Sequence, residues 1–296
     1  MEVYLFFAVL AALIFASASL LSKHYLDIEI DDHLFAGSVF GLPFFLLFIA
    51  LGVYRGNIIF SGLFSVASFS AGALYSVILI LYLRGLSEEE ASRFIPTIAL
   101  NTIFLAIMSF FLLGQKFSII EYLGMFLAVS GSILISLENP LNDLLELHSE
   151  IGTILAVGIA LLIAFRDTMI EFATQSYDLW SALLWMGAGG VIFSLSVIFL
   201  TRRNKFAFNE FKGQSHMLGV GSLRSFGFLA YTVAISLGPA AKASAILKLN
   251  GMLVFMGATL IGLFRPGFIE EDTGKWKVFQ KFIASSMIIA GVLLVR

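Results

Sequence analysis

The sequence of 296 residues contains no cysteine and few charged residues, and both shortages narrow what the protein can be. The absence of cysteine excludes disulfide bonds, cysteine-ligated zinc and thiol catalysis. Charged residues make up 13% of the chain, whereas soluble globular proteins carry about 25%. A chain with so little charge cannot cover itself with a hydrated surface. The composition therefore predicts an integral membrane protein.

Motifs for catalysis, nucleotide binding and nucleic-acid binding are also missing. There is no HExxH zinc motif, no glycine-rich loop that opens a helix after a strand, and no P-loop. The histidines, His24, His33, His148 and His216, lie in or beside loops, which leaves no Ser-His dyad inside the membrane. No basic patch supports nucleic-acid binding. We therefore expect no enzyme activity, cofactor, bound metal or nucleic-acid partner.

Long apolar runs account for most of the chain, which is 59% hydrophobic and has a mean hydropathy of +0.96. A helix needs about 20 apolar residues to cross a bilayer, and continuous runs favour helices over the alternating strands of a barrel. The predicted spans are 3–22, 34–54, 58–82, 88–113, 119–137, 151–171, 179–200, 216–237, 240–264 and 278–295. The sequence predicts an all-α protein with ten transmembrane helices, crossing the cell membrane many times.

The chain repeats itself at half its length. Pairs that share one offset of 149 residues are Tyr82/Tyr231, Ser87/Ser236, Ala91/Ala240, Arg93/Lys242, Leu100/Leu249 and Asn101/Asn250. The first apolar segments match at 148, as in Ala8/Ala156 and Leu13/Leu161. We predict a first repeat at 1–137, an acidic linker at 138–150 and a second repeat at 151–296. The signal-peptide-like start has a repeat partner and no basic residue before it, so we expect it to remain as the first helix.

An odd number of spans in each repeat fixes how the two copies are related. With five helices per repeat, the second copy must enter the membrane upside down. Inverted repeats of this kind are typical of secondary transporters, whose site lies near the bilayer midplane between the repeats. The alternative is a duplicated helical scaffold that transports nothing.

One group of residues carries a family resemblance. It comprises Glu90-Ala91-Ser92-Arg93-Phe94-Ile95-Pro96, Leu100-Asn101, Leu112-Leu113-Gly114-Gln115-Lys116, Tyr122-Leu123-Gly124 and Ser130-Gly131. This pattern resembles the drug/metabolite transporter superfamily and, within it, the EamA-type branch. The resemblance implies ten helices in two five-helix repeats, with both termini in the cytoplasm. Thr102 and Gln115 stand where the family often has proline and glutamate, which affects the subfamily more than the superfamily.

The basic residues favour the opposite orientation. Cytoplasmic termini would leave only Arg55, Lys116 and Lys242 in cytoplasmic loops. The other side would hold Lys23, Arg202, Arg203, Lys205, Lys212, Arg265, Lys275 and Lys277. The positive-inside rule places such residues in the cytoplasm. Family layout and charge count therefore disagree, and the orientation stays open.

Ionisable residues within predicted spans are the first candidates for a site, because a charge in hydrocarbon is costly. Arg224 lies roughly 12 Å into its helix, and Tyr231 follows seven residues later on nearly the same face. Tyr75, the repeat counterpart of Arg224, and Tyr82 form the same stripe. An arginine facing a cavity can bind a carboxylate or phosphate through paired hydrogen bonds. The alternative is a structural pair between Arg224 and Asp167.

Five further residues, in three sets, are also candidates for the site. Arg166 and Asp167 form either a salt bridge, at the interface or between helices, or an anion ligand with a carboxylate gate. Lys248 replaces Ala99 of the first repeat and is expected to line the pathway. It shares a cavity with Asn250 only if the helix is irregular, because the two residues are about 200° apart on a regular helix. Asn101 and Asn250, the symmetric mid-helix amides, either bind other helices or face a central substrate.

Deep basic residues outnumber deep acidic ones, so an anionic guest would stabilise the cavity. We predict a secondary transporter that moves a small polar or anionic metabolite, such as an amino acid, organic acid or phosphorylated compound, by alternating access. The candidate substrate-binding residues are Arg224, Lys248, Asn101, Asn250, Tyr231, Tyr75, Arg166 and Asp167.

Two alternatives remain, an exporter of hydrophobic cations or drugs and a scaffold or lipid-handling protein that transports nothing. The first span has no acidic residue, which disfavours a proton-coupled cation extruder that uses a first-helix carboxylate. The expected partners are the substrate, the lipid bilayer and either a coupling ion or an exchanged substrate. The sequence leaves open whether the protein is a monomer or a homodimer.

Overall fold

The computed structural model describes residues 3–25, 33–56, 58–88, 94, 97–137, 151–201, 215–264 and 275–296. All regular structure within these residues is helical, which confirms the all-α prediction. The helices are α1 (Val3–Tyr25), α2 (His33–Arg55), α3 (Gly62–Glu88), α5 (Asn101–Leu113), α6 (Ile119–Ser136), α8 (Ile151–Ser176), α9 (Leu179–Thr201), α10 (Ser215–Leu237), α11 (Ala240–Leu247), α12 (Leu249–Phe264) and α13 (Lys275–Val295).

Apolar helices of membrane-spanning length dominate the described residues. By length and composition, eight segments can cross a membrane: Val3–Leu21, Leu34–Arg55, Gly62–Gly85, Ile119–Ser136, Ile151–Gln175, Leu179–Thr201, Gly219–Leu237 and Ala240–Ile261. Two shorter apolar helices, Asn101–Leu113 and Phe279–Val295, fall within the fourth and tenth predicted spans. The positions agree with the predicted spans, and the protein is a multi-pass membrane protein.

Two helices run further than the sequence predicted. The third span was expected to end at residue 82, but α3 continues to Glu88. The sixth was expected to end at residue 171, but α8 continues to Ser176. Polar residues ended the apolar run in α8, yet no glycine or proline follows them to end the helix. Residues near position 167 are therefore well inside α8 rather than at its end.

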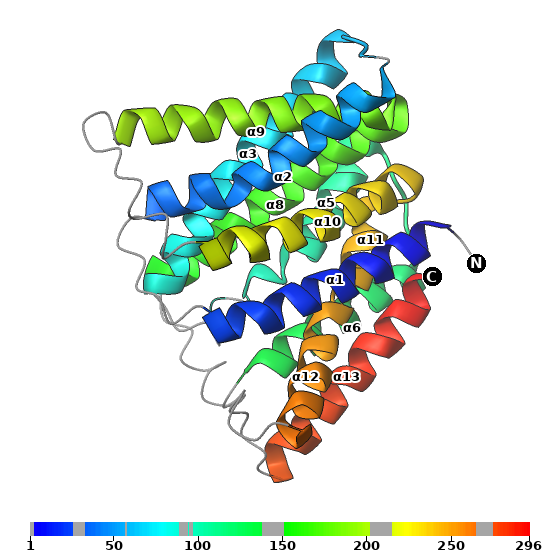
Figure 1. Ribbon diagram of the computed structural model, residues 1–296. Coiled ribbons are helices and arrows are strands. Elements are labelled where there is room, and N and C mark those ends of the chain that lie inside the picture. Colours follow the sequence, from blue (N-terminus) through cyan, green and yellow to red (C-terminus); the bar gives the residue numbers. More distant parts are fainter. Residues whose placement is uncertain are drawn as a thin grey trace.

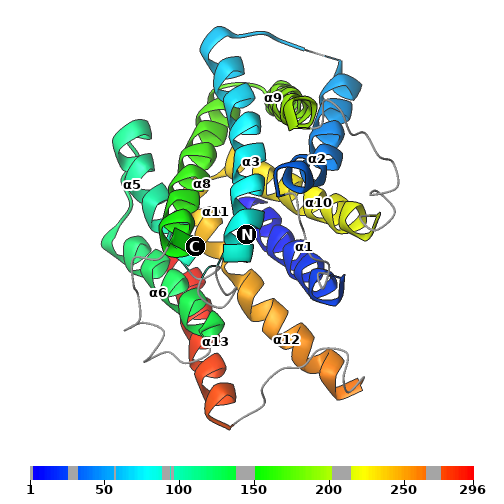
Figure 2. The ribbon, with the colours of Figure 1, turned by 90° about the vertical axis from the view of Figure 1, so that its left-hand side faces the viewer.

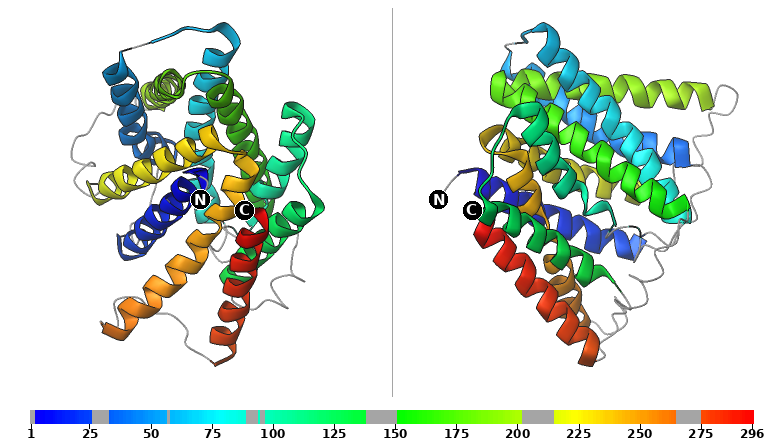
Figure 3. Two further views of the ribbon diagram at one scale, coloured as in Figure 1. Left: turned by 90° about the vertical axis from the view of Figure 1, so that its right-hand side faces the viewer. Right: turned by 180° about the vertical axis from the view of Figure 1, so that it is seen from behind.

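The long helices form a ring around one short helix. Each helix contacts the next in the order α9, α2, α10, α1, α12, α13, α6, α5, α8 and α3, and α3 returns to α9 (Figure 3, left). The short helix α11 lies inside this ring and contacts α1, α5, α6, α8, α10 and α13 (Figure 2). The start of α1 and the end of α13 lie at the same end of the bundle (Figure 1). Residues on α11 are thus placed centrally.

Glycine allows close approach at two of the main helix contacts. A Cβ on Gly72 of α3 or Gly189 of α9 would overlap a backbone carbonyl of the other helix. Between α6 and α13, a Cβ on Gly124 would lie 2.7 Å from the carbonyl oxygen of Gly291. Small residues at helix contacts are the usual way for membrane helices to pack. These glycines therefore allow the close helix contacts between α3 and α9 and between α6 and α13.

Two helical runs are interrupted at corresponding places in the two halves. In the first half a turn at Ala99 precedes α5, and the Thr102 N–H donates to the Ala99 carbonyl at 3.4 Å. In the second half a turn at Lys248 separates α11 from α12, and the Gly251 N–H donates to the Lys248 carbonyl at 3.2 Å. Both bonds span three residues instead of the four of an α-helix. The two bonds also lie 149 residues apart, as the repeat predicts.

Candidate functional site

An ion pair is buried within α8. Arg166 is 5% exposed and Asp167 is fully buried. Nε and Nη2 of Arg166 both donate to Oδ1 of Asp167, at 2.8 and 2.6 Å. Oδ2 of Asp167 accepts from the Tyr231 hydroxyl of α10 at 2.8 Å. The pair lies well inside α8 and within the apolar segment Ile151–Gln175.

The Arg166 guanidinium also lies against aromatic rings. Its central carbon is 5.0 Å from the Tyr75 ring centre and 4.7 Å from that of Phe228. These two rings stack with their centres 4.7 Å apart, and Phe44 packs against both. An arginine over aromatic faces gains cation–π stabilisation. Tyr75 therefore contacts Arg166 with the face of its ring. The carboxylate partner of Arg166 is Asp167.

A second cluster lies at the two interrupted helices. Nζ of Lys248 donates to Oδ1 of Asn101 at 2.7 Å. Nδ2 of Asn101 donates to Oγ of Ser244 at 3.3 Å, and the Ser244 and Thr102 hydroxyls are 2.7 Å apart. This cluster joins α11 to α5 across the two halves. Sequence analysis missed Ser244 and Thr102, although their positions beside the mid-helix polar residues were a usable signal.

The two clusters connect into one chain of polar groups. The Tyr231 hydroxyl, bonded to Asp167, also lies within interaction range of the Ser244 hydroxyl. Asp167 and Lys248 are close enough to interact electrostatically. We call this set the central polar chain; its members are Arg166, Asp167, Tyr231, Ser244, Thr102, Asn101 and Lys248. It runs from α8 past α10 to the interrupted helices at the centre of the ring.

Arg224 and Asn250 carry buried atoms without hydrogen-bond partners. Nε of Arg224 and Oδ1 of Asn250 are both of this kind. The Arg224 guanidinium lies 6.0 Å from the Phe40 ring centre. Asp167 takes its bonds from Arg166 and Tyr231, so a pair between Arg224 and Asp167 is not what the structure shows. Buried polar atoms normally have partners, so a polar ligand is one way to satisfy these two.

Sequence analysis also missed a second buried carboxylate. Glu171 is fully buried and lies one helical turn after Asp167 on α8. Its Oε1 accepts from Nε2 of Gln115 at 2.6 Å and from Nε2 of Gln175 at 3.1 Å. The backbone N–H of Ala240 also donates to this carboxylate. The predicted span ended at Glu171, which made it an interface residue; its spacing of four from Asp167 was the available signal.

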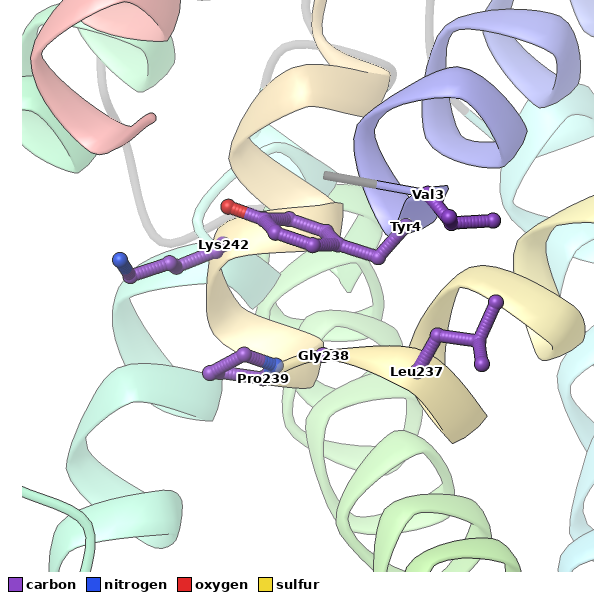
Figure 4. Close-up of a pocket in the computed structure, with 6 residues that line it drawn as sticks. All are labelled: Val3, Tyr4, Leu237, Gly238, Pro239 and Lys242. Carbon is purple, nitrogen blue, oxygen red and sulfur yellow. The ribbon is translucent and has the colours of Figure 1, made fainter. Parts of the chain in front are cut away.

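A cavity of about 530 Å³ lies where α1 begins and α10 meets α11. It is lined by Val3, Tyr4, Leu237, Gly238, Pro239 and Lys242 (Figure 4). Lys242 forms an ion pair with Glu121 of α6. Its symmetric partner Arg93 lies outside the described residues. In the part of the chain that the structure describes, no three acidic or histidine side chains come together as metal ligands.

Comparison with known proteins addresses the predicted resemblance. Residues 3–137 match the family model of the EamA-like transporter family, which confirms it. A solved structure, described only as the crystal structure of a protein, superposes with a TM-score of 0.70 at 13% identity. The superposition covers 99% of this chain and 97% of that chain. At this identity the likeness shows the fold alone. No match is found among curated proteins.

Proposed function

Residues 3–137 match the EamA-like transporter family, and from that premise we propose that the protein is a secondary transporter for a small polar or anionic metabolite. The family consists of membrane transporters of the drug/metabolite type and not of enzymes. The protein is accordingly a membrane transporter of this type. The substrate class, the transport mechanism and the location in the cell membrane are the proposed part.

The observation that carries the proposal is the place of Lys248. It lies in the turn between α11 and α12, at the centre of the ring, and its ammonium bonds to the amide oxygen of Asn101. An amide oxygen does not neutralise the charge. Transporters commonly build their substrate site where a membrane helix is interrupted, and a charge inside the membrane marks such a site.

The charges around Lys248 favour an anionic guest. Arg166 and Asp167 cancel each other as a bonded pair. Lys248 and Arg224 add two positive charges, and Arg224 of α10 interacts electrostatically with Tyr75 of α3, the ring against which Arg166 lies. A charge inside a membrane without a bonded counter-charge is costly, so a carboxylate or phosphate would be favoured beside Lys248. The unpartnered Nε of Arg224 is a further buried donor on α10.

The helix contacts support two inverted repeats that move against each other. Under the repeat, α1 corresponds to α8 and α3 corresponds to α10. The contact of α1 with α10 then has its equivalent in the contact of α8 with α3, and both are extensive. The contacts of α2 with α9 and of α6 with α13 each join a helix to its own counterpart. This pairing suits a pseudo-two-fold axis, about which alternating access would operate.

A thermal-shift screen of the purified full chain tests the substrate class. The panel contains organic acids, amino acids, phosphorylated compounds and hydrophobic aromatic cations. We expect anions to raise the melting temperature of the wild type but not of Lys248→Met. Arg55→Gln removes an exposed basic residue at the end of α2 and should leave the response unchanged. Stabilisation by anions that is equal in Lys248→Met would remove Lys248 from the site.

One observation favours a second candidate, the export of hydrophobic cations. The rings of Tyr75 and Phe228 already lie against a guanidinium, and Phe44 packs on both rings; such an aromatic cluster suits an aromatic or alkylated cation. Stabilisation by the cation members of the panel, with none by anions, would support this candidate instead. Flux into proteoliposomes separates both candidates from a scaffold, because a scaffold gives no substrate-dependent flux.

A further inference from the structure

Two buried oxygen atoms without hydrogen-bond partners belong to one bonded pair of side chains. They are Oε2 of Glu171 and Oε1 of Gln115. The other ends of the same two groups are bonded, since Nε2 of Gln115 donates to Oε1 of Glu171 at 2.6 Å. A carboxylic acid and a primary amide can form two such bonds at once, N–H to C=O and O–H to C=O. The two unpartnered atoms are those that the second bond would use.

The second hydrogen bond, between Oε2 of Glu171 and Oε1 of Gln115, requires one proton. With Glu171 ionised, both unpartnered atoms are acceptors and neither can donate. One proton on Oε2 of Glu171 turns that atom into a donor to Oε1 of Gln115. The same proton removes a negative charge from a fully buried side chain inside a membrane span, where a charge is costly. A single proton therefore satisfies two atoms and neutralises one charge.

The donors around Glu171 argue against a metal ion at this place. Its Oε1 receives N–H groups from Gln115 and Gln175, and the carboxylate also receives the N–H of Ala240. Cations such as Ca²⁺ need several oxygen ligands converging on one point. Here N–H groups converge on the carboxylate instead.

Glu171 lies between the cavity and the central polar chain. Gln175, an exposed side chain, bonds to Oε1 of Glu171 and to the carbonyl oxygen of Gly238, at 3.1 Å each. Gly238 lines the 530 Å³ cavity, whose wall is completed by residues of α1 (Figure 4). On its other side, one helical turn away, Asp167 belongs to the central polar chain. Gln175 thus links Glu171 to the wall of the cavity.

The other charged groups near Glu171 are already paired or exposed. The titratable and charged groups on the surrounding elements include Asp167 and Arg166 of α8, Tyr177 and Asp178 beyond its end, Tyr75, Tyr82 and Arg84 of α3, Arg224 and Tyr231 of α10, Lys116 beside Gln115, Lys242 of α11, Lys248 at the end of α11 and Glu121 of α6. Lys248 bonds to Asn101, and Arg224 lies near the Phe40 ring. Asp167 pairs with Arg166 and Lys242 pairs with Glu121. Asp178 bonds to Ser181, and Lys116 is exposed. Within the described residues Glu171 has amide partners and no ion pair.

We propose that Glu171 and Gln115 form a proton-binding site and that the proton bound there is the coupling ion of transport. The binding site stands independently of the proposed function, whereas its use as a coupling site rests on it. The proton resides on Oε2 of Glu171, shared with Oε1 of Gln115, and leaves the ionised carboxylate when it is released.

Infrared difference spectroscopy tests the site directly with protons as the probe. Purified full-length protein in lipid nanodiscs is moved between acidic and alkaline buffer, and the carboxyl C=O band of a protonated acid is recorded in H₂O and D₂O. We expect the wild type to lose one such band on alkalinisation. Glu171→Gln should lack this band and retain its circular dichroism and elution volume. Glu121→Gln, the matched control, should keep it, and Gln115→Leu should shift its frequency because the acid–amide pair is lost.

Each other outcome overturns the proposal. A band that persists in Glu171→Gln belongs to a different acid. Without any pH-dependent band in the wild type, Glu171 does not exchange a proton. A band that disappears only when Na⁺ is added at constant pH identifies a metal-ion site. None of these results depends on transport, so a failure of the proposed function is seen separately, as an absence of flux in proteoliposomes.

Discussion

The two halves of the chain supply different chemistry to the centre of the molecule. The first half contributes neutral groups, the Tyr75 ring and the side chains of Asn101, Thr102 and Gln115. The second half contributes charged residues, of which Arg166, Asp167 and Glu171 are buried and Arg224 and Lys248 are half-buried. Three contacts between the halves join one kind to the other: Lys248 to Asn101, Glu171 to Gln115 and Arg166 to Tyr75.

This difference shows how a duplicated scaffold can become a selective one. The backbone is repeated, since both copies interrupt a helix at the same place, at Ala99 and at Lys248. The charges are not repeated. A cationic side chain that bonds to a neutral amide can still attract an anionic ligand, whereas one that bonds to a carboxylate is neutralised. The neutral partner Asn101 in the first half therefore leaves the charge of Lys248 available.

The largest effect is expected at the Arg166–Asp167 ion pair, which lies entirely in the second half. Asp167→Asn leaves the buried Arg166 without a counter-charge, and breaking a buried pair in this way costs about 3–5 kcal/mol. The double variant Arg166→Met/Asp167→Asn removes both charges and should recover much of this loss. Unfolding in detergent, followed by circular dichroism, measures both. If the single variant is as stable as the wild type, the pair is not a closed structural unit.

The next largest effect is expected from Lys248→Ala, which removes the difference in side chain between the two helix interruptions. Lys248→Ala gives the second copy the alanine of the first, at Ala99. A hydrogen bond to a charged group contributes about 1.5–3 kcal/mol, so we expect the affinity for the anion to fall roughly 10- to 150-fold. Asn101 keeps its bond to Ser244, so the folded yield should be unchanged. Ligand titration by thermal shift measures the affinity.

The arginine variant provides the control for the charge. Lys248→Arg keeps the positive charge and should retain part of the affinity. Equal losses in Lys248→Ala and Lys248→Arg would mean that the shape of the turn, and not its charge, selects the ligand.

A smaller effect is expected from Glu171→Gln on the acceleration of substrate accumulation by a pH gradient. The amide cannot gain or lose a proton, but it keeps the size and the hydrogen bonding of the acid. In proteoliposomes, an imposed pH gradient should accelerate substrate accumulation by the wild type and not by the variant. Substrate exchange without a gradient should persist in both. Glu121→Gln is the control and should still respond to the gradient; a variant Glu171→Gln that responds equally would exclude this residue as the coupling site.

Much of the fold could be predicted because it depends on patterns that the chain repeats. Apolar length indicated the spans, and the offset of 149 paired Asn101 with Asn250, which lie beside the two interruptions that the structure shows. The central location of Lys248 also followed, because a lysine deep within an apolar run is stable only where it faces the bundle interior or a water-filled cavity.

The missing part of the site depends on helix ends and on partners distant in sequence. A polar residue near the end of an apolar run can lie at the interface or inside a longer helix, and the sequence does not distinguish these for Glu171. The partner of Arg166 was its own neighbour, because a long arginine side chain can fold back along the helix. The pairing of Gln115 with Glu171 spans 56 residues of sequence and leaves no local pattern.

The smallest effect concerns the neutral contact between the halves. Thr102 of α5 shares a hydroxyl contact of 2.7 Å with Ser244 of α11, and hydrogen bonds between membrane helices are worth about 0.6–1.7 kcal/mol. Thr102→Val should lower the free energy of unfolding by that amount. Thr232→Val is the matched control, because Thr232 is equally buried but bonds only within α10, to the Phe228 carbonyl. An equal loss in both variants would mean that the hydroxyl contact adds nothing to the joining of the halves beyond what a bond within one helix contributes.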